Sequence, residues 1–213
     1  MIKSMLARKD SSIVYWLGNN LYLNITNRCS NNCYFCIRNF KSGVGGFKLK
    51  LDKEPTIDEI IGELQKYVNM RNWNEIVFCG FGEPLERLDA VIQVCGWIKR
   101  FYGKASFIRI DTNGHGYLLN VGRDVVKELR GAGVNKISIS LNAQDSETYK
   151  RVCRPNFEDA FENVLDFVRR ARKVFDVEIT AVAIPEVNVE RVREIADSLN
   201  VNFRLREYIP CSW

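Results

Sequence analysis

The stretch PTIDEIIGELQKYVNMRNWNEIVFCGFGEP, residues 55–84, holds a helical pattern, a strand-like run and a glycine-rich loop in that order. Thr56 and Glu59 match the T-x-x-E capping box that starts many helices, and apolar residues then recur on one helical face. The run EIVFC, residues 75–79, is short and rich in β-branched and aromatic residues, as buried strands are. A helix and a strand of this kind form the repeating unit of an α/β fold.

The same alternation extends over most of the chain. Strand-like runs also occur at residues 21–26, 106–110, 136–140, 178–184 and 202–208, and helical patterns at 85–101, 121–131, 157–173 and 189–199. This alternation predicts βαβ units with right-handed crossovers and a parallel sheet. A full barrel has eight units and takes about 250 residues, which is more than this chain offers. We therefore predict an α/β fold with a parallel sheet, either open or curled into a partial (β/α)6 TIM-like barrel.

Length and composition limit the class of protein. The 213 residues contain no Pro/Gly/Ser-rich linker or repeat, so we expect one domain over residues 1–213, with residues 1–20 as an extension or hairpin and 21–208 as the core. Hydrophobic residues make up 46% and charged residues 27%, which excludes extended disorder. No apolar run reaches the roughly 18 residues that span a bilayer, so we expect a cytoplasmic protein without a membrane partner. The net charge of +5 suits an anionic substrate, RNA or an ordinary basic surface.

Three cysteines stand close together directly after the first predicted strand, in the segment NRCSNNCYFCIRN, residues 27–39. Cys29, Cys33 and Cys36 have C-x3-C-x2-C spacing, and ligands of such folds gather in the loops at the carboxyl ends of the strands. A structural zinc site usually needs four ligands, whereas three thiolates can hold three irons of a [4Fe-4S] cluster and leave one iron open. The other four cysteines are scattered, and Cys153 is expected to be a buried or idle thiol.

The cysteine motif, with an aromatic residue just before its last cysteine, resembles the signature of the radical S-adenosylmethionine (SAM) enzymes. The resemblance implies that the three cysteines bind a [4Fe-4S] cluster and that Phe35 packs on the adenine side of SAM. It also implies that an external electron donor of the ferredoxin or flavodoxin type drives cleavage of SAM to a 5′-deoxyadenosyl radical. That radical abstracts hydrogen from a substrate that the sequence does not identify, whether a small molecule, a peptide or RNA.

The loop GFGEP, residues 80–84, follows the second predicted strand. Taken alone, it is either a turn that leads into a helix with Pro84 near its first position or a loop whose glycines admit a ligand close to the backbone. It is similar to the glycine-glycine-glutamate-proline element of radical SAM enzymes, with Phe81 in place of the commonest glycine. The similarity implies that Glu83 holds the methionine amino group of SAM. The implied SAM contacts in this loop are Gly80, Phe81, Gly82, Glu83 and Pro84.

The next loop reads DTNGHG, residues 111–116. Asp-Thr-Asn-Gly is ordinary turn chemistry after a strand, yet it also recurs at this point in glycyl-radical activating enzymes and their relatives. That resemblance implies that Asp111 and Thr112 line the methionine carboxylate side of SAM, with a monovalent cation near Asp111, and that Asn113 is a further SAM contact. His115 is the only histidine of the chain. A lone histidine in a surface loop is often structural or solvated, but its position makes it our candidate catalytic residue for substrate contact or proton transfer.

The fourth and fifth predicted strands end in SISLNAQD and AVAIPEVN. Ser138 and Ser140 share one strand face, which is unusual in an apolar core. By resemblance, Ser140 and Asn142 contact the ribose or carboxylate of SAM, and the backbone near Ile184 lies against adenine.

Basic residues in the last third of the chain are open to two interpretations. Arg204 and Arg206 are two apart on the last predicted strand and therefore point the same way, and further basic residues occur at Lys150, Arg151 and Arg154. Each group is either a solvated basic patch or a clamp for an anionic substrate.

Four segments are most similar to the TatD-linked radical SAM proteins, namely LGNNLYLNITNRCSNNCYFCIRN, GFGEP, DTNGHG and SLNAQDSETYKRVCRP. That similarity fixes no reaction, and a glycyl-radical-enzyme activase and a deazapurine- or RNA-modifying enzyme are the alternatives. A non-catalytic iron-sulfur electron carrier and a zinc-binding adaptor also stay open. The carrier would need a fourth ligand, and the adaptor would have no use for the glycine-glutamate loop.

Overall fold

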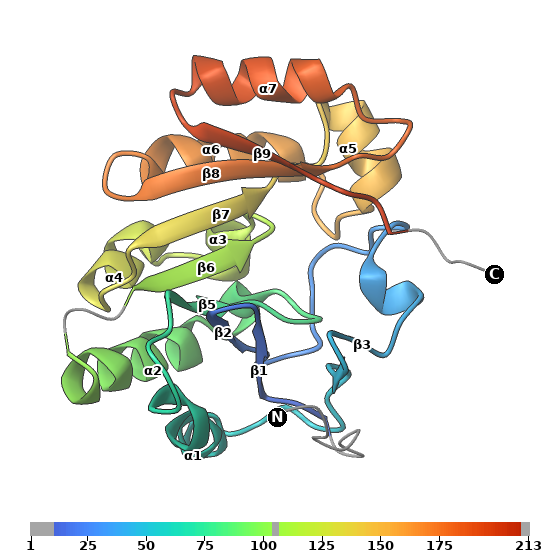
Figure 1. Cartoon of the computed structure of the whole chain (residues 1–213). Coiled ribbons are helices and arrows are strands. Elements are labelled where there is room, and N and C mark those ends of the chain that lie inside the picture. The colour runs from blue at the N-terminus through green and yellow to red at the C-terminus, as the bar shows by residue number, and fades with distance from the viewer. Residues whose placement is uncertain (1–10, 104–106, 210–213) are drawn as a thin grey trace.

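A single curved sheet organises the chain in the computed structural model, which describes residues 11–103 and 107–209 (Figure 1). Its strand order is β1-β2-β5-β6-β7-β8-β9. The first two strands pair antiparallel and every later pair is parallel. The strands are β1 (Val14–Leu17), β2 (Asn20–Leu23), β5 (Glu75–Phe78), β6 (Ile108–Thr112), β7 (Lys136–Ser140), β8 (Asp176–Val182) and β9 (Asn202–Arg206). The predicted α/β fold with a parallel sheet is confirmed, and an open partial barrel is consistent with this order.

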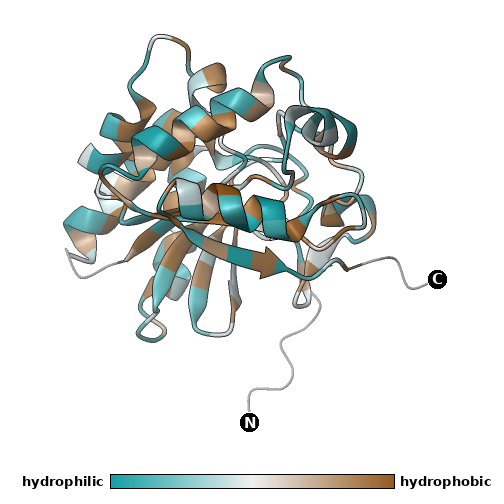
Figure 2. Ribbon diagram, turned by 90° about the horizontal axis from the view of Figure 1, so that it is seen from above, coloured by the Kyte–Doolittle hydropathy of each residue, from teal (hydrophilic) through white to brown (hydrophobic). Residues whose placement is uncertain are grey.

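Helices follow most strands and run along the outer side of the sheet (Figure 1). They are α1 (Ile57–Val68), α2 (Leu88–Phe101), α3 (Gly116–Leu119), α4 (Val125–Gly131), α5 (Ser146–Cys153), α6 (Ala160–Ala171) and α7 (Val189–Ser198). Two 3-10 turns, η1 (Ile37–Asn39) and η2 (Pro84–Arg87), and a small hairpin of β3 (Gly43–Val44) and β4 (Phe47–Lys48) complete the described elements. The helices alternate polar and apolar residues in Figure 2, as amphipathic helices do. No described helix is long and apolar enough to cross a membrane.

The two faces of the sheet differ sharply in polarity. On β6, Ile108 and Ile110 are fully buried in the core against the helices, whereas Arg109 and Asp111 point to the opposite, inner face. The inner face therefore carries charged side chains in the place where a closed barrel packs branched apolar ones. This polar inner face matters for the site described below.

The structure differs from the sequence-based expectations at several elements. The helix expected at 85–101 is a 3-10 turn followed by α2, and the helix expected at 121–131 begins at Val125. Helix α5 was not predicted, because it has only eight residues and most of them are polar. Strands β1 and β2 form the hairpin that was expected within residues 1–20. Residues 1–10 and the expected strand start at residue 106 lie outside the described part of the chain. That residues 1–213 make one domain stays a prediction.

The capping box of α1 is present as predicted. The Glu59 backbone N–H donates to Thr56 Oγ1 at 3.2 Å, and the Thr56 N–H donates to Glu59 Oε2 at 2.8 Å. We expect Thr56→Ala to lower the free energy of unfolding by about 1 kcal/mol, because one N-terminal amide of the helix loses its partner. Urea unfolding of this variant beside Thr56→Ser, which keeps the hydroxyl, measures the effect. Equal stability of the alanine and serine variants would contradict it.

Candidate active site

The loops that carry the predicted site residues all leave the sheet at one edge, because β2, β5, β6 and β7 run parallel. The cysteine loop, residues 27–36, follows β2 and is held by the end of α5. The Asn32 N–H donates to Cys153 O at 3.0 Å, and the Tyr34 N–H donates to Val152 O at 3.2 Å. Arg38 Nη2 adds a 2.8 Å bond to the carbonyl of Asn31. These hydrogen bonds hold the cysteine loop against the end of α5.

Cys29, Cys33 and Cys36 are partly exposed free thiols on this loop. Within the described part of the chain, no three His, Cys, Asp or Glu side chains converge closely enough to hold one metal ion. A zinc ion requires such convergence, whereas a [4Fe-4S] cube takes one thiolate per iron and spreads its ligands around it. Three thiols on one loop are the donor set that a [4Fe-4S] cluster with three protein ligands takes.

The three thiols differ in their proton affinity. Burial raises the pKa of Cys29 to about 12 and also raises the pKa of Cys36. A hydrogen bond from Cys153 is the main cause that lowers the pKa of Cys33. Cys153 is buried, as expected, and its thiol interacts with Cys33, which the sequence did not suggest. Bound iron would have to displace the proton from Cys29.

The glycines of the GFGEP loop serve close packing within the chain. A Cβ atom at Gly80 would lie 2.1 Å from Asn24 Oδ1, and one at Gly82 would lie 2.4 Å from the carbonyl oxygen of Thr26. These glycines admit the segment just after β2, and their predicted contact with SAM stays a prediction. They bring the loop against the chain segment that leads into the cysteine loop. Pro84 begins η2, as the turn interpretation expected.

Glu83 is a buried carboxylate that only neutral groups contact. Its Oε1 accepts from Thr112 Oγ1 at 2.8 Å and from the Leu85 N–H at 3.0 Å, and its Oε2 accepts from the Asn113 N–H at 2.6 Å. Burial outweighs these bonds and raises the pKa of Glu83 to about 7. Among the described residues, no lysine or arginine forms an ion pair with it. A cationic ligand group would supply the missing charge.

Asn113 connects Glu83 to the cysteine loop. Its Nδ2 donates to Ser30 Oγ at 2.9 Å and makes a longer contact of 3.8 Å to Cys29 Sγ. The backbone of Asn113 bonds Glu83, and its side chain bonds the cysteine loop, so one residue sets their separation. Sequence reasoning predicted Asn113 as a SAM contact but did not predict this linking role.

His115 is fully buried, so its expected place in a surface loop is wrong. Its Nδ1 lies 2.9 Å from Ser30 Oγ, and its Nε2 lies 3.0 Å from the hydroxyl of Tyr149 on α5. Burial lowers the pKa of His115 to about 4, so the ring is neutral at pH 7. Both ring nitrogens are engaged in holding the cysteine loop against α5.

The remaining predicted residues fall into two groups. Phe35, Phe81 and Ile184 are buried apolar side chains, and Phe35 packs edge-on against Tyr34 at 5.5 Å. Asp111 lies on the inner face and pairs with Arg109 at 2.8 Å rather than with the Glu83 group. Ser140 and Asn142, at the end of β7, both accept hydrogen bonds from Arg206. Polar residues that the sequence did not single out, Ser30 and Tyr149 among them, complete the site and carry no local motif that would reveal them.

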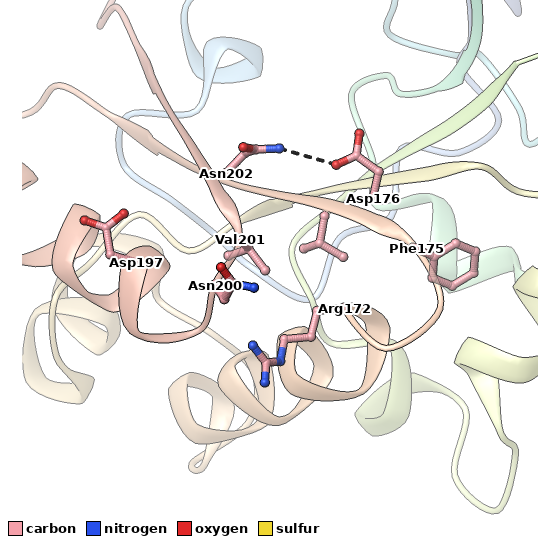
Figure 3. Close-up of a pocket in the computed structure, with 8 residues that line it drawn as sticks. Arg172, Phe175, Asp176, Asp197, Asn200, Val201 and Asn202 are labelled. Atoms are coloured by element: carbon pink, nitrogen blue, oxygen red, sulfur yellow. Dashed lines mark hydrogen bonds between the residues drawn. The ribbon is translucent and has the colours of Figure 1, made fainter.

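Two cavities help to locate the site. One of about 500 Å³ borders the cysteine loop and is lined by Asn27, Arg38, Asn39, Phe40, Lys41, Ser42, Lys50 and Phe81. The other, of about 330 Å³, lies at the amino ends of β8 and β9, where Asn202 donates to Asp176 (Figure 3). Because ligands of parallel sheets bind at the carboxyl ends of the strands, the cavity in Figure 3 is at the wrong edge.

Comparison with known sequences gives consistent relatives. An uncharacterized protein of Methanocaldococcus jannaschii is 25% identical over 178 residues, which are 84% of this chain and 52% of that protein. The GTP 3′,8-cyclase of Lactiplantibacillus plantarum is 28% identical over 193 residues, 88% of this chain and 53% of that protein. The chain thus spans about half the length of these curated relatives.

Solved structures share the fold. Streptococcus suis SuiB bound to S-adenosylmethionine superposes with a TM-score of 0.67 at 14% identity, over 91% of this chain and 41% of that one. Methylornithine synthase (PylB) gives 0.63 at 16% identity, over 90% and 53%. The family model described as the Radical SAM superfamily matches residues 23–199, from the last residue of β2 to just after α7. With the three-cysteine loop and the Glu83 loop at the edge where ligands bind, the chain belongs to the radical SAM superfamily.

Proposed function

We propose that Cys29, Cys33 and Cys36 hold the [4Fe-4S] cluster of this radical SAM enzyme and that its substrate binds over the same edge of the sheet. Membership of the superfamily implies the cluster, SAM and a source of electrons. The observation that carries the assignment is the hydrogen-bond chain through Asn113, which links the buried carboxylate of Glu83 to the cysteine loop. An electron carrier or a zinc adaptor has no use for such a carboxylate.

When bound, the cluster and SAM supply a one-electron bond cleavage that yields a hydrogen-abstracting radical. The residues of the chain bind and orient the groups that react, and they exclude water from the reaction. Glu83 accepts the amino group of SAM, and Asn113 keeps this carboxylate at a fixed distance from the thiols. Phe35 covers the adenine side from within the core.

The other predicted SAM contacts extend this arrangement along the edge. Ser140 and Asn142 present side-chain oxygens at the end of β7, and Ile184 is a buried residue just after β8. We propose that Ser140 and Asn142 face the ribose or the carboxylate of SAM and that Ile184 faces adenine, as the family resemblance implies. Asp111 pairs with Arg109 at 2.8 Å, and the monovalent cation expected near it stays a prediction.

We favour a small anionic molecule as the substrate and an external one-electron donor as the partner. The favoured substrate class rests on the relatives named as GTP 3′,8-cyclases and on the cationic side chains of the inner face. The chain matches only 59% and 53% of the length of two of those relatives, so their reaction itself is not transferred. The closer similarity to TatD-linked radical SAM proteins stays a prediction.

The cysteine assignment is tested by replacing each ligand. Wild-type protein reconstituted without oxygen should bind about four irons and, with dithionite, convert SAM to 5′-deoxyadenosine. Cys29→Ala, Cys33→Ala and Cys36→Ala should each lose the iron and the activity, whereas Cys95→Ala, in the core, should keep both. Iron analysis and chromatography of the nucleoside measure the outcome. A colourless wild type with one bound zinc would refute the assignment.

The role of Glu83 predicts weaker SAM binding in Glu83→Gln. The amide keeps the shape but loses the charge, and a charge-assisted hydrogen bond contributes about 1.5–3 kcal/mol, so the dissociation constant should rise roughly 10- to 100-fold. Glu86→Gln is the matched control, since Glu86 pairs with Arg28 instead. Isothermal titration with the iron-loaded protein gives both constants. Equal SAM affinity of the two variants would show that Glu83 does not hold the amino group.

We propose that His115 positions the cysteine loop and does not contact the substrate. Its pKa of about 4 in the folded chain lies below about 6.5 in the unfolded chain, so acid protonates the unfolded state first and stability falls as the pH drops from 7 to 4. Over this window, the iron-free wild type should lose about 3 kcal/mol more unfolding free energy than His115→Gln. Urea unfolding at several pH values measures the difference.

Two results would contradict this role of His115. Parallel stability curves for wild type and His115→Gln would show that the ring is not held neutral by burial. If His115 instead moved a proton to or from a substrate, His115→Gln would bind the cluster and cleave SAM at the wild-type rate yet form no product.

A further inference from the structure

The cationic side chains of the inner face have carboxylate partners, with one exception. Arg109 bonds Glu75 at 2.5 Å and Asp111 at 2.8 Å. On the neighbouring strands, Arg204 bonds Glu178 at 2.9 Å, and Lys136 lies 3.9 Å from the same carboxylate. These pairs form a ladder across β5 to β9 in which each charge is offset by its neighbour.

Arg206 is the exception. It lies two residues beyond Arg204 on β9, so both side chains leave the same face of the strand. Its Nη2 donates to Ser140 Oγ at 3.2 Å and to Asn142 Oδ1 at 3.4 Å, and both acceptors are uncharged. Its Nε is buried and has no hydrogen-bond partner among the described residues. Asp111 acts on Arg206 only at longer range, because its oxygens bond Arg109.

An arginine in this position is energetically costly without an anion. Guanidinium stays protonated at all ordinary pH values, and a buried N–H that lacks a hydrogen-bond partner, as the Arg206 Nε–H does, loses its hydration without compensation. Arg206 sits at the carboxyl end of β9, next to Asn142 and within electrostatic reach of Cys33. The Nε–H donor of Arg206, which lacks a partner, is therefore at the edge of the sheet where the proposed function places the substrate.

We propose that Arg206 binds the anionic group, a carboxylate or a phosphate, of the molecule on which this enzyme acts. The Nε–H and one Nη–H of a guanidinium form a fork that matches either group with two parallel bonds. Nη2, the fork partner of Nε, is held by Ser140 and Asn142, which fixes the guanidinium plane and leaves the Nε–H without a partner. This inference rests on the proposed function, because it assigns the unpaired donor of Arg206 to the substrate of that same site.

Anion binding to the iron-loaded protein tests the proposal, with inorganic phosphate and malonate as probes. Wild type should bind at least one of them, and Arg206→Gln should bind it at least tenfold more weakly. Arg204→Gln is the matched control on the same strand face, since Arg204 already has Glu178, and should bind the probe as wild type does. The probe that binds more tightly identifies the class of anion. Wild-type affinity in Arg206→Gln, or no binding to wild type, would overturn the proposal.

Two further measurements separate the substrate from other negative groups. If Arg206→Gln weakens binding of SAM but not of decarboxylated SAM, the arginine serves the cofactor's carboxylate and the proposal fails. If Arg206→Gln shifts the reduction potential of the cluster and leaves phosphate and malonate binding unchanged, the arginine offsets the charge of the iron-sulfur site and the proposal also fails. Should Arg206→Gln not fold, Arg206→Lys keeps the charge but loses the fork, and it should bind the probe more weakly than wild type does.

These experiments distinguish failure of the Arg206 inference from failure of the proposed function. Failure of the radical SAM assignment would appear as wild type and Arg204→Gln that do not convert SAM to 5′-deoxyadenosine. Failure of the Arg206 inference alone would appear as active wild type whose anion affinity does not depend on residue 206.

Discussion

The hydrogen bonds of Asn113 hold the parts of the site in register. Its backbone N–H bonds Glu83 at the end of the β5 loop, and its side chain bonds Ser30 beside the first cysteine. His115, two residues later, continues from Ser30 to Tyr149 on α5. The loops that follow β2, β5 and β6 are thereby fixed relative to one another and to helix α5. Preorganisation of this kind allows ligands to bind without a large cost in loop entropy.

Hydrogen bonds within the chain stiffen the cysteine loop. Backbone bonds from Asn32 and Tyr34 to the end of α5 hold it in place, and Cys153 at that end also donates to Cys33. A chain of this length can bury a core large enough to be stable without metal. The site is therefore free to use its ligands for reactivity, with the fold already formed around them.

The inner face of the sheet shows how an open barrel differs from a closed one. A closed barrel fills its interior with branched apolar side chains in layers, whereas this sheet carries a ladder of ion pairs there. Charged groups are tolerated there because each lies beside a group of opposite charge. Arg206 departs from this rule, and departures from local consistency are typical of functional sites.

The amino-acid sequence by itself determined the order of strands and helices, the capping box at Thr56 and the position of the cysteine and Glu83 loops at the ends of strands. These features follow from short-range periodicity and from the rule that parallel strands share one ligand-binding edge. Helix α5 escaped prediction because eight mostly polar residues give too weak a pattern.

Only the tertiary structure decided the burial of His115, the contact between Cys153 and Cys33 and the missing partner of Arg206. Each depends on residues between 34 and 120 positions apart in the chain, such as His115 with Tyr149 and Cys33 with Cys153. No local pattern records such pairs, because the chemistry of a side chain says what it can bond but not which distant group the fold will bring to it.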